Sequence, residues 1–370
     1  MKSRLVALVI PFVLAIGLIA VGCAPQAAPE GEEAAPSGEE ESTPSAPSSE
    51  VFEWKMQTYY PTADPAYGAM VGVTERIAEA SGGRLLIECF TGGAIVPQGQ
   101  ELDSLNKGVF QMAYVSHGFQ TNLFPASFLF AQRIGGLTPI QAMTWLRYGG
   151  GDELADELYA PLEKVHYVAT PMIHPPEVWC HSNKELKSLD DFQGLKIRSP
   201  GDSGAVLSLM GASSVSLPGS EIYESAQRGV IDATEYITQA TNWDMGFQEV
   251  FDYLYLSPAR APSDSIGIWA NADAWEEIGT DLQAVVEACM HEETMRWYSW
   301  SLENDAIALQ KFKDYGTVVG TIPADIDAAL LEAAGTYFAE KAAGDAMFAK
   351  VMESQDAWKA LCDGQGDWAN

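Results

Sequence analysis

The sequence predicts an α/β fold, arranged as two lobes, for residues 51–370. Throughout this part of the chain, short segments with strand-like alternation are followed by longer segments with helical periodicity. Alternation of this kind is typical of parallel sheets with helices on both faces. A body of about 320 residues is also longer than one hydrophobic core usually supports, which favours two lobes.

The first half of this body predicts strands over 51–57, 84–90 and 110–115, and helices over 66–80, 101–107 and 139–159. Glycines follow several of these segments, as expected where a helix or strand ends. Within the long helix, Gly149-Gly150-Gly151 predicts a break. It is a poor phosphate cradle, because Asp152 and Glu153 follow it and would repel an anion.

The second half predicts short strands near 167–172, 195–197 and 231–236, with helices between them. The last hundred residues are mostly helical, with predicted helices over 272–313, 323–342 and 345–361. No internal repeat is visible in the chain.

The first 22 residues have the pattern of a secretory signal, with Lys2 and Arg4 before an apolar run over 5–21. The following Ala20-Val21-Gly22-Cys23 resembles the lipobox of bacterial lipoproteins, although leucine is more usual than Ala20. The resemblance implies cleavage before Cys23 and acylation of its thiol. A plain signal peptide or an uncleaved anchor is the alternative, but the apolar run would only just span a bilayer. We expect a protein that is lipid-anchored through Cys23 and works outside the cytoplasm.

Residues 23–50 predict a disordered acidic linker. This segment is rich in Ala, Pro, Ser, Gly and Glu, and it contains no aromatic residue, Lys or Arg. Such a composition cannot bury enough apolar surface to offset the entropy cost of ordering. At Val51 the composition changes abruptly, which marks the start of the folded body.

The folded body is strongly acidic. Removing the two positive charges of the signal and the seven glutamates of the linker from the total of −30 leaves −25. This charge argues against nucleic acid as a partner and against adhesion to anionic lipid, so the lipid anchor is the only membrane contact we expect. The four later cysteines are widely spaced and predict free thiols, with one disulfide left open.

No enzyme motif is present in the sequence. It lacks GxSxG, HExxH, GxxxxGK[ST], and a GxGxxG after a strand. Glu177 and Glu235 could be imagined as a catalytic carboxylate pair, but no nucleophile or acid/base motif accompanies them. The sequence therefore predicts a binding protein rather than an enzyme.

Five motifs, in register along the chain, carry a family resemblance. They are 81–84 (SGGR) with 92–93 (GG), 101–108 (ELDSLNKG), 145–154 (WLRYGGGDEL) with 158–160 (LYA), 189–201 (LDDFQGLKIRSPG) and 218–235 (PGSEIYESAQRGVIDATE). Together they strongly resemble the solute-binding proteins of TRAP (tripartite ATP-independent periplasmic) transporters. The third motif is similar to that of the branch that binds α-keto and α-hydroxy acids such as pyruvate and lactate.

The resemblance implies a two-lobed periplasmic-binding-protein fold, type II-like, with a long lobe-spanning helix after Asn271. Lobe I would comprise about 51–173 and 264–290 and lobe II about 174–263, with the C-terminal helices packing across both. Such a protein closes on a small carboxylate, most simply a 2-oxo or 2-hydroxy monocarboxylic acid. It then delivers this ligand to the small and large membrane subunits of the transporter. Monomer and homodimer both remain open.

Arg198 is the candidate ligand anchor. In the family, an arginine at this place in the KIR segment makes a bidentate salt bridge to the substrate carboxylate. A planar guanidinium matches a carboxylate well, and the pairing strengthens in a dry cleft. The alternative is an ordinary surface ion pair between Arg198 and Asp202 or Glu221.

The same branch holds a cation beside the substrate carboxylate. The resemblance places its ligands at Glu235, at the backbone carbonyl of Tyr236 and at Glu177, where the family has a glutamine. Two carboxylates would favour an oxygen-loving ion such as Ca²⁺, with Na⁺ the other candidate. Three alternatives stay open. Arg260 could pair with Glu177 and remove the need for a metal. Arg260 could also bind a second carboxylate on a larger ligand, or Glu177 could be a solvated hinge-strand residue.

Around these groups we expect an amphipathic wall. Aromatic residues are core residues by default, but loops at the carboxyl ends of strands face the ligand crevice in open α/β sheets. This argument favours Tyr60, Phe119 and Trp179 as ligand contacts, and Asn242 as a donor to a keto or hydroxyl oxygen. A binding protein for an ABC importer, or a ligand sensor, remains the alternative function.

Overall fold

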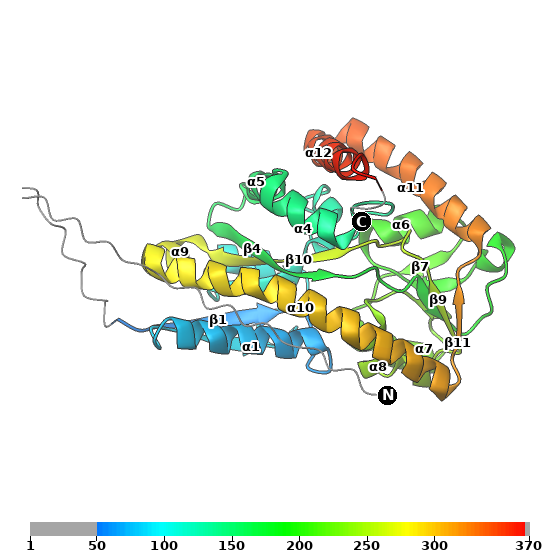
Figure 1. Ribbon diagram of the computed structural model, residues 1–370, viewed down its shortest axis with the longest axis horizontal. Coiled ribbons are helices and arrows are strands. Elements are labelled where there is room, and N and C mark those ends of the chain that lie inside the picture. The colour runs from blue at the N-terminus through cyan, green and yellow to red at the C-terminus, as the bar shows by residue number, and fades with distance from the viewer. Residues whose placement is uncertain (1–49, 367–370) are drawn as a thin grey trace, which may run out of the picture. The chain divides into compact units, whose positions relative to one another are not determined.

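The computed structural model describes residues 50–366 (Figure 1). The predicted signal peptide, the lipidation site Cys23 and nearly all of the predicted linker lie outside the described residues. Among the helices that the structure describes, none is long and apolar enough to cross a membrane. The four cysteines after Cys23 are free thiols.

The first sheet has the strand order β2-β1-β3-β10-β4. Its strands are β1 (Phe52–Thr58), β2 (Leu85–Phe90), β3 (Met112–Ser116), β4 (Val165–His174) and β10 (Asp264–Asn271). β1 is parallel to β2 and β3, but β10 is antiparallel to both β3 and β4. Parallel sheets were expected, but this sheet is mixed. Asp264 lies opposite His174, so β10 enters the sheet at the end where β4 leaves it and must run in the reverse direction.

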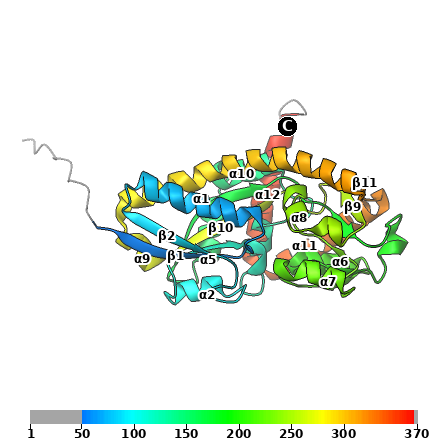
Figure 2. The same cartoon turned by 90° about the horizontal axis from the view of Figure 1, so that it is seen from below.

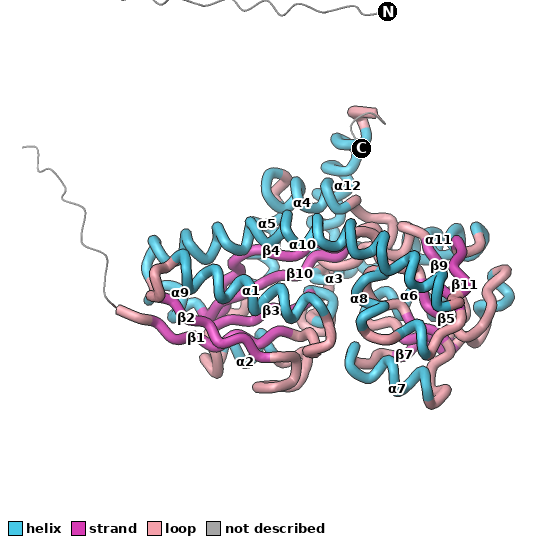
Figure 3. The backbone as a smooth tube through the Cα atoms, turned by 60° about the horizontal axis from the view of Figure 1, so that its bottom comes forward, coloured by secondary structure: helices cyan, strands magenta, loops and turns pink. Residues whose placement is uncertain are grey.

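The second sheet has the order β11-β9-β5-β8-β6-β7. Its strands are β5 (Cys180–Ser182), β6 (Lys196–Arg198), β7 (Ser213–Val215), β8 (Ala233–Thr234), β9 (Tyr253–Leu256) and β11 (Val318–Thr321). β5 is antiparallel to β8 and β9, whereas β6 is parallel to β7 and β8. Strand β11, which the sequence did not predict, pairs along β9 at the edge of the sheet. Figure 3 shows the two sheets as separate groups of strands.

Helices cover both sheets. They are α1 (Pro65–Ala80), α2 (Glu101–Asn106), α3 (Ser127–Phe130), α4 (Pro139–Tyr148), α5 (Gly151–Tyr159), α6 (Gly201–Leu209), α7 (Ile222–Gln227), α8 (Gln239–Asp244), α9 (Ala272–Glu277), α10 (Gly279–Tyr315), α11 (Ala324–Gly344) and α12 (Ala346–Asp363). The predicted break in the helix over 139–159 is present: α4 ends before Gly149, and Gly150 adopts a φ of 86°. A Cβ on Gly149 would lie only 2.7 Å from the Trp145 side chain, which explains why glycine stands there.

The long helix α10 runs past both sheets (Figure 2). On one side the hydroxyl of Thr294 donates to the carbonyl of Thr170 in β4. On the other, Asp305 accepts a hydrogen bond from the backbone of Ala240 in α8. The sequence predicted one helix over 272–313, but a glycine with φ 76° at position 279 separates the short α9 from α10. The lobe boundaries given above stay a prediction.

α1 shows how the sequence positions an element next to the sheet. Asp64 caps its first turn by accepting the Ala66 N–H at 2.9 Å. Met70, Val73 and Ile77 recur at helical spacing and are fully buried in the core shared with β1, β2 and α10. Each such side chain contributes about 1.5–3 kcal/mol by leaving water. This burial fixes the end of β1, from which Tyr59 and Tyr60 follow.

Candidate functional site

A pocket with about 40 Å³ of free space lies between loops that follow strands of the two sheets. Its lining residues are Tyr59, Gln98, Ser116, Gly118, Phe119, Gln132, Arg198, Pro200, Gly219, Glu235, Tyr236, Ile237 and Asp264. Tyr59 follows β1, and Ser116 and Phe119 lie at the end of β3, while Arg198 ends β6 and Glu235 follows β8. These strand ends meet as expected for ligand crevices in open α/β sheets.

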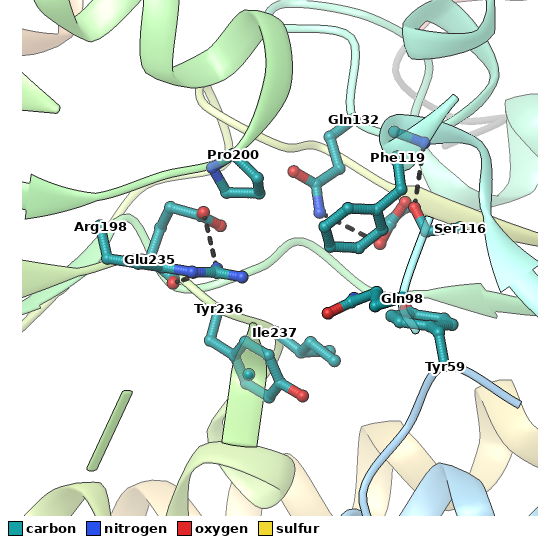
Figure 4. Close-up of a pocket in the computed structure, with 13 residues that line it drawn as sticks. Tyr59, Gln98, Ser116, Phe119, Gln132, Arg198, Pro200, Glu235, Tyr236 and Ile237 are labelled. Atoms are coloured by element: carbon teal, nitrogen blue, oxygen red, sulfur yellow. Dashed lines mark hydrogen bonds and ion pairs between the residues drawn. The ribbon is translucent and has the colours of Figure 1, made fainter. Parts of the chain in front are cut away.

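Arg198 is held rigidly at the pocket, with only 3% of its side chain exposed. Its Nε donates to the Leu217 carbonyl at 3.0 Å, and its Nη1 donates to the carbonyl and the Oε1 of Glu235, both at 3.1 Å. The guanidinium also lies 5.6 Å from the centre of the Tyr236 ring. Nη2 takes part in none of these bonds, and the guanidinium points toward the centre of the pocket (Figure 4).

The alternative of a surface ion pair for Arg198 does not describe this arrangement. Asp202 instead accepts from Lys341 at 3.0 Å and from the hydroxyl of Tyr337 at 3.0 Å, two residues of α11. The carboxylate that pairs with Arg198 is Glu235, which is equally buried.

Arg260 and Glu177 form a second buried ion pair behind Glu235. Arg260 is completely buried: its Nη2 donates to Glu177 Oε2 and, at 3.0 Å, to the Val178 carbonyl, and its Nε donates to the Trp179 carbonyl at 3.1 Å. Its Nη1 lies 3.1 Å from Glu235 Oε2. Glu177 is therefore not the solvated hinge residue considered above. The pairing between Arg260 and Glu177, given above as one alternative, is present.

Among the polar lining residues that the sequence did not predict, Gln132 and Asp264 lie next to the glutamates of the site. The Gln132 amide donates to Glu177 Oε1 at 3.0 Å and to Asp264 Oδ2 at 3.1 Å. Burial raises the pKa of Asp264 to about 7, and the neighbouring Glu235 adds to this shift. Asp264 is the first residue of β10, and a strand end is a position that could have flagged it, whereas Gln132 lies in a loop without any motif.

Of the predicted residues, Arg198, Glu235, Tyr236 and Phe119 line the pocket, and the other four lie outside its lining. Tyr60 bonds His174 at 3.2 Å, and the preceding Tyr59 faces the pocket instead. Glu177 reaches the site through Gln132 and Arg260.

Trp179 and Asn242 point away from the pocket. The Trp179 indole packs against Phe192 and donates to Asp327 of α11 at 2.8 Å. The Asn242 carboxamide accepts the Ile237 N–H at 3.2 Å and bonds His181 at 3.1 Å, so it braces the backbone behind the pocket. Both side chains have protein partners and neither lines the pocket, so their contact with a ligand stays a prediction.

Residues 56–345 match the family model of the bacterial extracellular solute-binding proteins, family 7. The chain belongs to this family. A monocarboxylate 2-oxoacid-binding periplasmic protein of Nostoc sp. is 28% identical over 308 residues, which cover 83% of this chain and 83% of the relative.

Two solved structures of TRAP transporter solute-binding proteins are similar in fold and sequence. That from Bordetella bronchiseptica has a TM-score of 0.80 and 27% identity, covering 85% of this chain and 94% of its own; it is a dimer with copurified calcium and picolinate in one site. That from Pseudoalteromonas atlantica has a TM-score of 0.80 and 25% identity, covering 86% of this chain and 97% of its own, and holds sodium and pyruvate.

These likenesses confirm the predicted resemblance and the two-lobed α/β fold. The protein described here is therefore a TRAP solute-binding protein. Its relatives are binding proteins rather than enzymes. Members of this family are extracellular binding proteins, so they act outside the cytoplasm. The expectation of calcium or sodium bound together with the ligand is met in the relatives from Bordetella and Pseudoalteromonas.

Proposed function

We propose that this protein captures a small 2-oxo or 2-hydroxy monocarboxylate in the pocket and delivers it to the small and large membrane subunits of a TRAP transporter. The observation that carries the proposal is Arg198, a buried guanidinium that reaches the pocket with Nη2 outside its protein bonds. The names of the relatives support the ligand class, because one binds 2-oxoacids and another holds pyruvate.

The geometry suits a small anion with a short apolar part. Arg198 would bind the carboxylate by charge-assisted hydrogen bonds, which are about twice as strong as neutral ones. Phe119, Tyr59 and Ile237 would cover the carbon chain, and the amide of Gln98 offers a donor for a 2-oxo or 2-hydroxy oxygen. The free space of the pocket, about 40 Å³, suits a small ligand and not a large one.

The protein would reach its transporter while tethered to a membrane. The sequence around Cys23 supports a lipid anchor, and the acidic segment over 24–50 supports an extended spacer between the anchor and the binding body. This arrangement would keep the binding body near the membrane subunits without membrane contacts of its own.

The test is calorimetry with pyruvate, lactate and 2-oxobutyrate on purified protein, in the presence and absence of Ca²⁺ and Na⁺. Arg198→Ala should weaken binding about 30-fold or more, because breaking a buried charge pair costs on the order of 2–5 kcal/mol. Arg198→Lys should restore only part of the affinity, since lysine lacks the planar fork. Arg228→Ala is the matched control, because Arg228 is an exposed arginine paired with Glu224 and does not line the pocket. Unchanged affinity in Arg198→Ala would remove Arg198 as the anchor.

A further inference from the structure

The carboxylates of Glu177 and Glu235 are already neutralised by arginine. Glu235 Oε1 accepts from Arg198 Nη1, and its Oε2 lies 3.1 Å from Arg260 Nη1. Glu177 Oε2 accepts from Arg260 Nη2, and its Oε1 accepts from the Gln132 amide at 3.0 Å. All four carboxylate oxygens therefore face an N–H group.

This arrangement does not fit a metal ion. Ca²⁺ takes six to eight oxygen ligands at about 2.3–2.6 Å, and these must have free lone pairs directed at the ion. Here the oxygens of both glutamates are directed at Arg198, Arg260 and Gln132, and two guanidinium charges beside them would repel a cation. Among the residues that the structure describes, there is no group of three or more His, Cys, Asp or Glu side chains that could hold a metal.

We propose that the guanidinium of Arg260 is the built-in cation of this site, so that the protein binds its carboxylate ligand without a metal ion. The proposal rests on the function proposed above and concerns the same pocket. Relatives from Bordetella and Pseudoalteromonas hold calcium or sodium with their ligands. In this chain the positive charge comes from a side chain that does not touch the pocket and acts through the two glutamates.

Charge balance explains why Arg260 is needed. Arg198 and Glu235 are in contact, so without a further positive charge Glu235 would neutralise Arg198 and compete with the ligand for it. Arg260 lies on the opposite oxygen of Glu235 and takes up part of its charge. This leaves the guanidinium of Arg198 for the incoming carboxylate.

Arg260 also has an unused donor in the right place. Its Nη1 is buried and lies at ion-pair distance from Glu235, but it makes no hydrogen bond of good geometry. When a ligand carboxylate takes over Nη1 of Arg198, Glu235 can turn its hydrogen bonding to Arg260 Nη1. No buried carboxylate is then left unpaired, which would otherwise be strongly unfavourable.

The first experiment uses the unaltered protein. It is dialysed against a chelator and then into chelator-free, sodium-free choline buffer, and pyruvate and lactate binding are measured by calorimetry with and without added Ca²⁺ or Na⁺. We expect dissociation constants that agree within about 2-fold in all buffers. Binding that appears only when Ca²⁺ or Na⁺ is added overturns this inference and leaves the proposed function standing. Absence of binding for every acid in every buffer counts against the proposed function itself.

The second experiment separates a charge role from a structural role of Arg260. In metal-free buffer, Arg260→Gln should weaken pyruvate binding about 30-fold or more, and added Ca²⁺ or Na⁺ should restore part of it, because the two glutamates are then free to hold a cation. Arg260→Lys, which keeps the charge, should retain more affinity than Arg260→Gln without metal. Arg228→Gln, on an exposed ion pair, is the control and should behave as the unaltered protein. Equal losses in Arg260→Gln and Arg260→Lys with no response to metal would show a purely structural residue and overturn the inference.

Discussion

The two walls of the pocket are built in different ways. The charged wall consists of Arg198 and Glu235 at strand ends of the second sheet, with Arg260 and Glu177 behind them. The neutral wall follows strands of the first sheet and consists of Tyr59, Gln98, Ser116 and Phe119. In the charged wall, the charge of each group is compensated by its neighbours. In the neutral wall, each side chain would contact the ligand independently of the others. Changes in the first should therefore affect folding and binding together, and changes in the second should affect binding alone.

The largest expected effect is that of Glu235→Ala on stability. The substitution removes the carboxylate that both Arg198 and Arg260 contact and leaves two buried cations less compensated. We expect a loss of about 3–5 kcal/mol in the free energy of unfolding, measured by urea denaturation. Glu224→Ala, which breaks an exposed ion pair with Arg228, should cost less than about 1 kcal/mol. Similar losses in the two variants would contradict the view of the charged wall as a buried network.

The difference between the walls also determines what the sequence could predict. Arg198 and Glu235 stand in motifs and Tyr236 directly follows one, and the chemistry of the three is explicit in the residue type. Which residues form the neutral wall depends on which side of a chain segment faces the pocket, and neighbouring residues face opposite sides. Tyr60 was therefore predicted to contact the ligand, whereas Tyr59 lines the pocket and Tyr60 bonds His174.

The fold was predicted to a similar extent. Long periodic segments such as α1, α11 and α12 were placed within a few residues of their observed bounds. The direction of β10 and the existence of β11 were missed, because both depend on pairing with strands far away in the sequence. Gln132 was missed for the same reason, since its partners Glu177 and Asp264 come from distant segments.

The stability of the protein should depend on pH through Asp64, a buried carboxyl that follows β1 of the first sheet. Burial raises its pKa to about 7, from 3.8. The folded state thus binds a proton more tightly than the unfolded state, so the contribution of Asp64 to stability falls as the pH rises from about 4 to about 7. Asp64→Asn keeps a capping side chain but cannot ionise. Urea denaturation measures the decrease in the free energy of unfolding between pH 5 and pH 8. This decrease should be about 1–4 kcal/mol smaller in Asp64→Asn than in the unaltered protein.

Asp264 is a second buried carboxyl with a raised pKa, and it is left unchanged in the Asp64→Asn variant. In the Asp64→Asn variant, a residual fall in stability with pH should remain because Asp264 still titrates. A pH dependence identical to that of the unaltered protein would mean that Asp64 stays charged in the folded state.

Phe119→Ala tests the neutral wall. Phe119 lines the pocket and packs against Tyr59 with ring centres 5.7 Å apart, and it is only partly buried. Removing it should weaken pyruvate binding about 10-fold, equivalent to about 1.4 kcal/mol, through lost apolar contact. The free energy of unfolding should change by less than about 1 kcal/mol. A loss of stability as large as that of Glu235→Ala would mean that the two walls do not differ in the way described.

The smallest effect is expected where the two walls are joined. The Tyr236 hydroxyl donates to Asp64 Oδ2 at 3.0 Å, which links the segment after β8 to the segment after β1. Tyr236→Phe removes this bond while keeping the ring beside Arg198, so pyruvate affinity should fall only about 5-fold, equivalent to about 1 kcal/mol. The loss should increase from pH 6 to pH 8, because an ionised Asp64 needs the donor more than a protonated one does. Tyr223→Phe removes an exposed hydroxyl bonded to Glu249 and should show neither the loss nor its pH dependence. If the Tyr236→Phe loss is the same at both pH values, the hydroxyl contributes contact to the pocket but does not respond to the charge of Asp64.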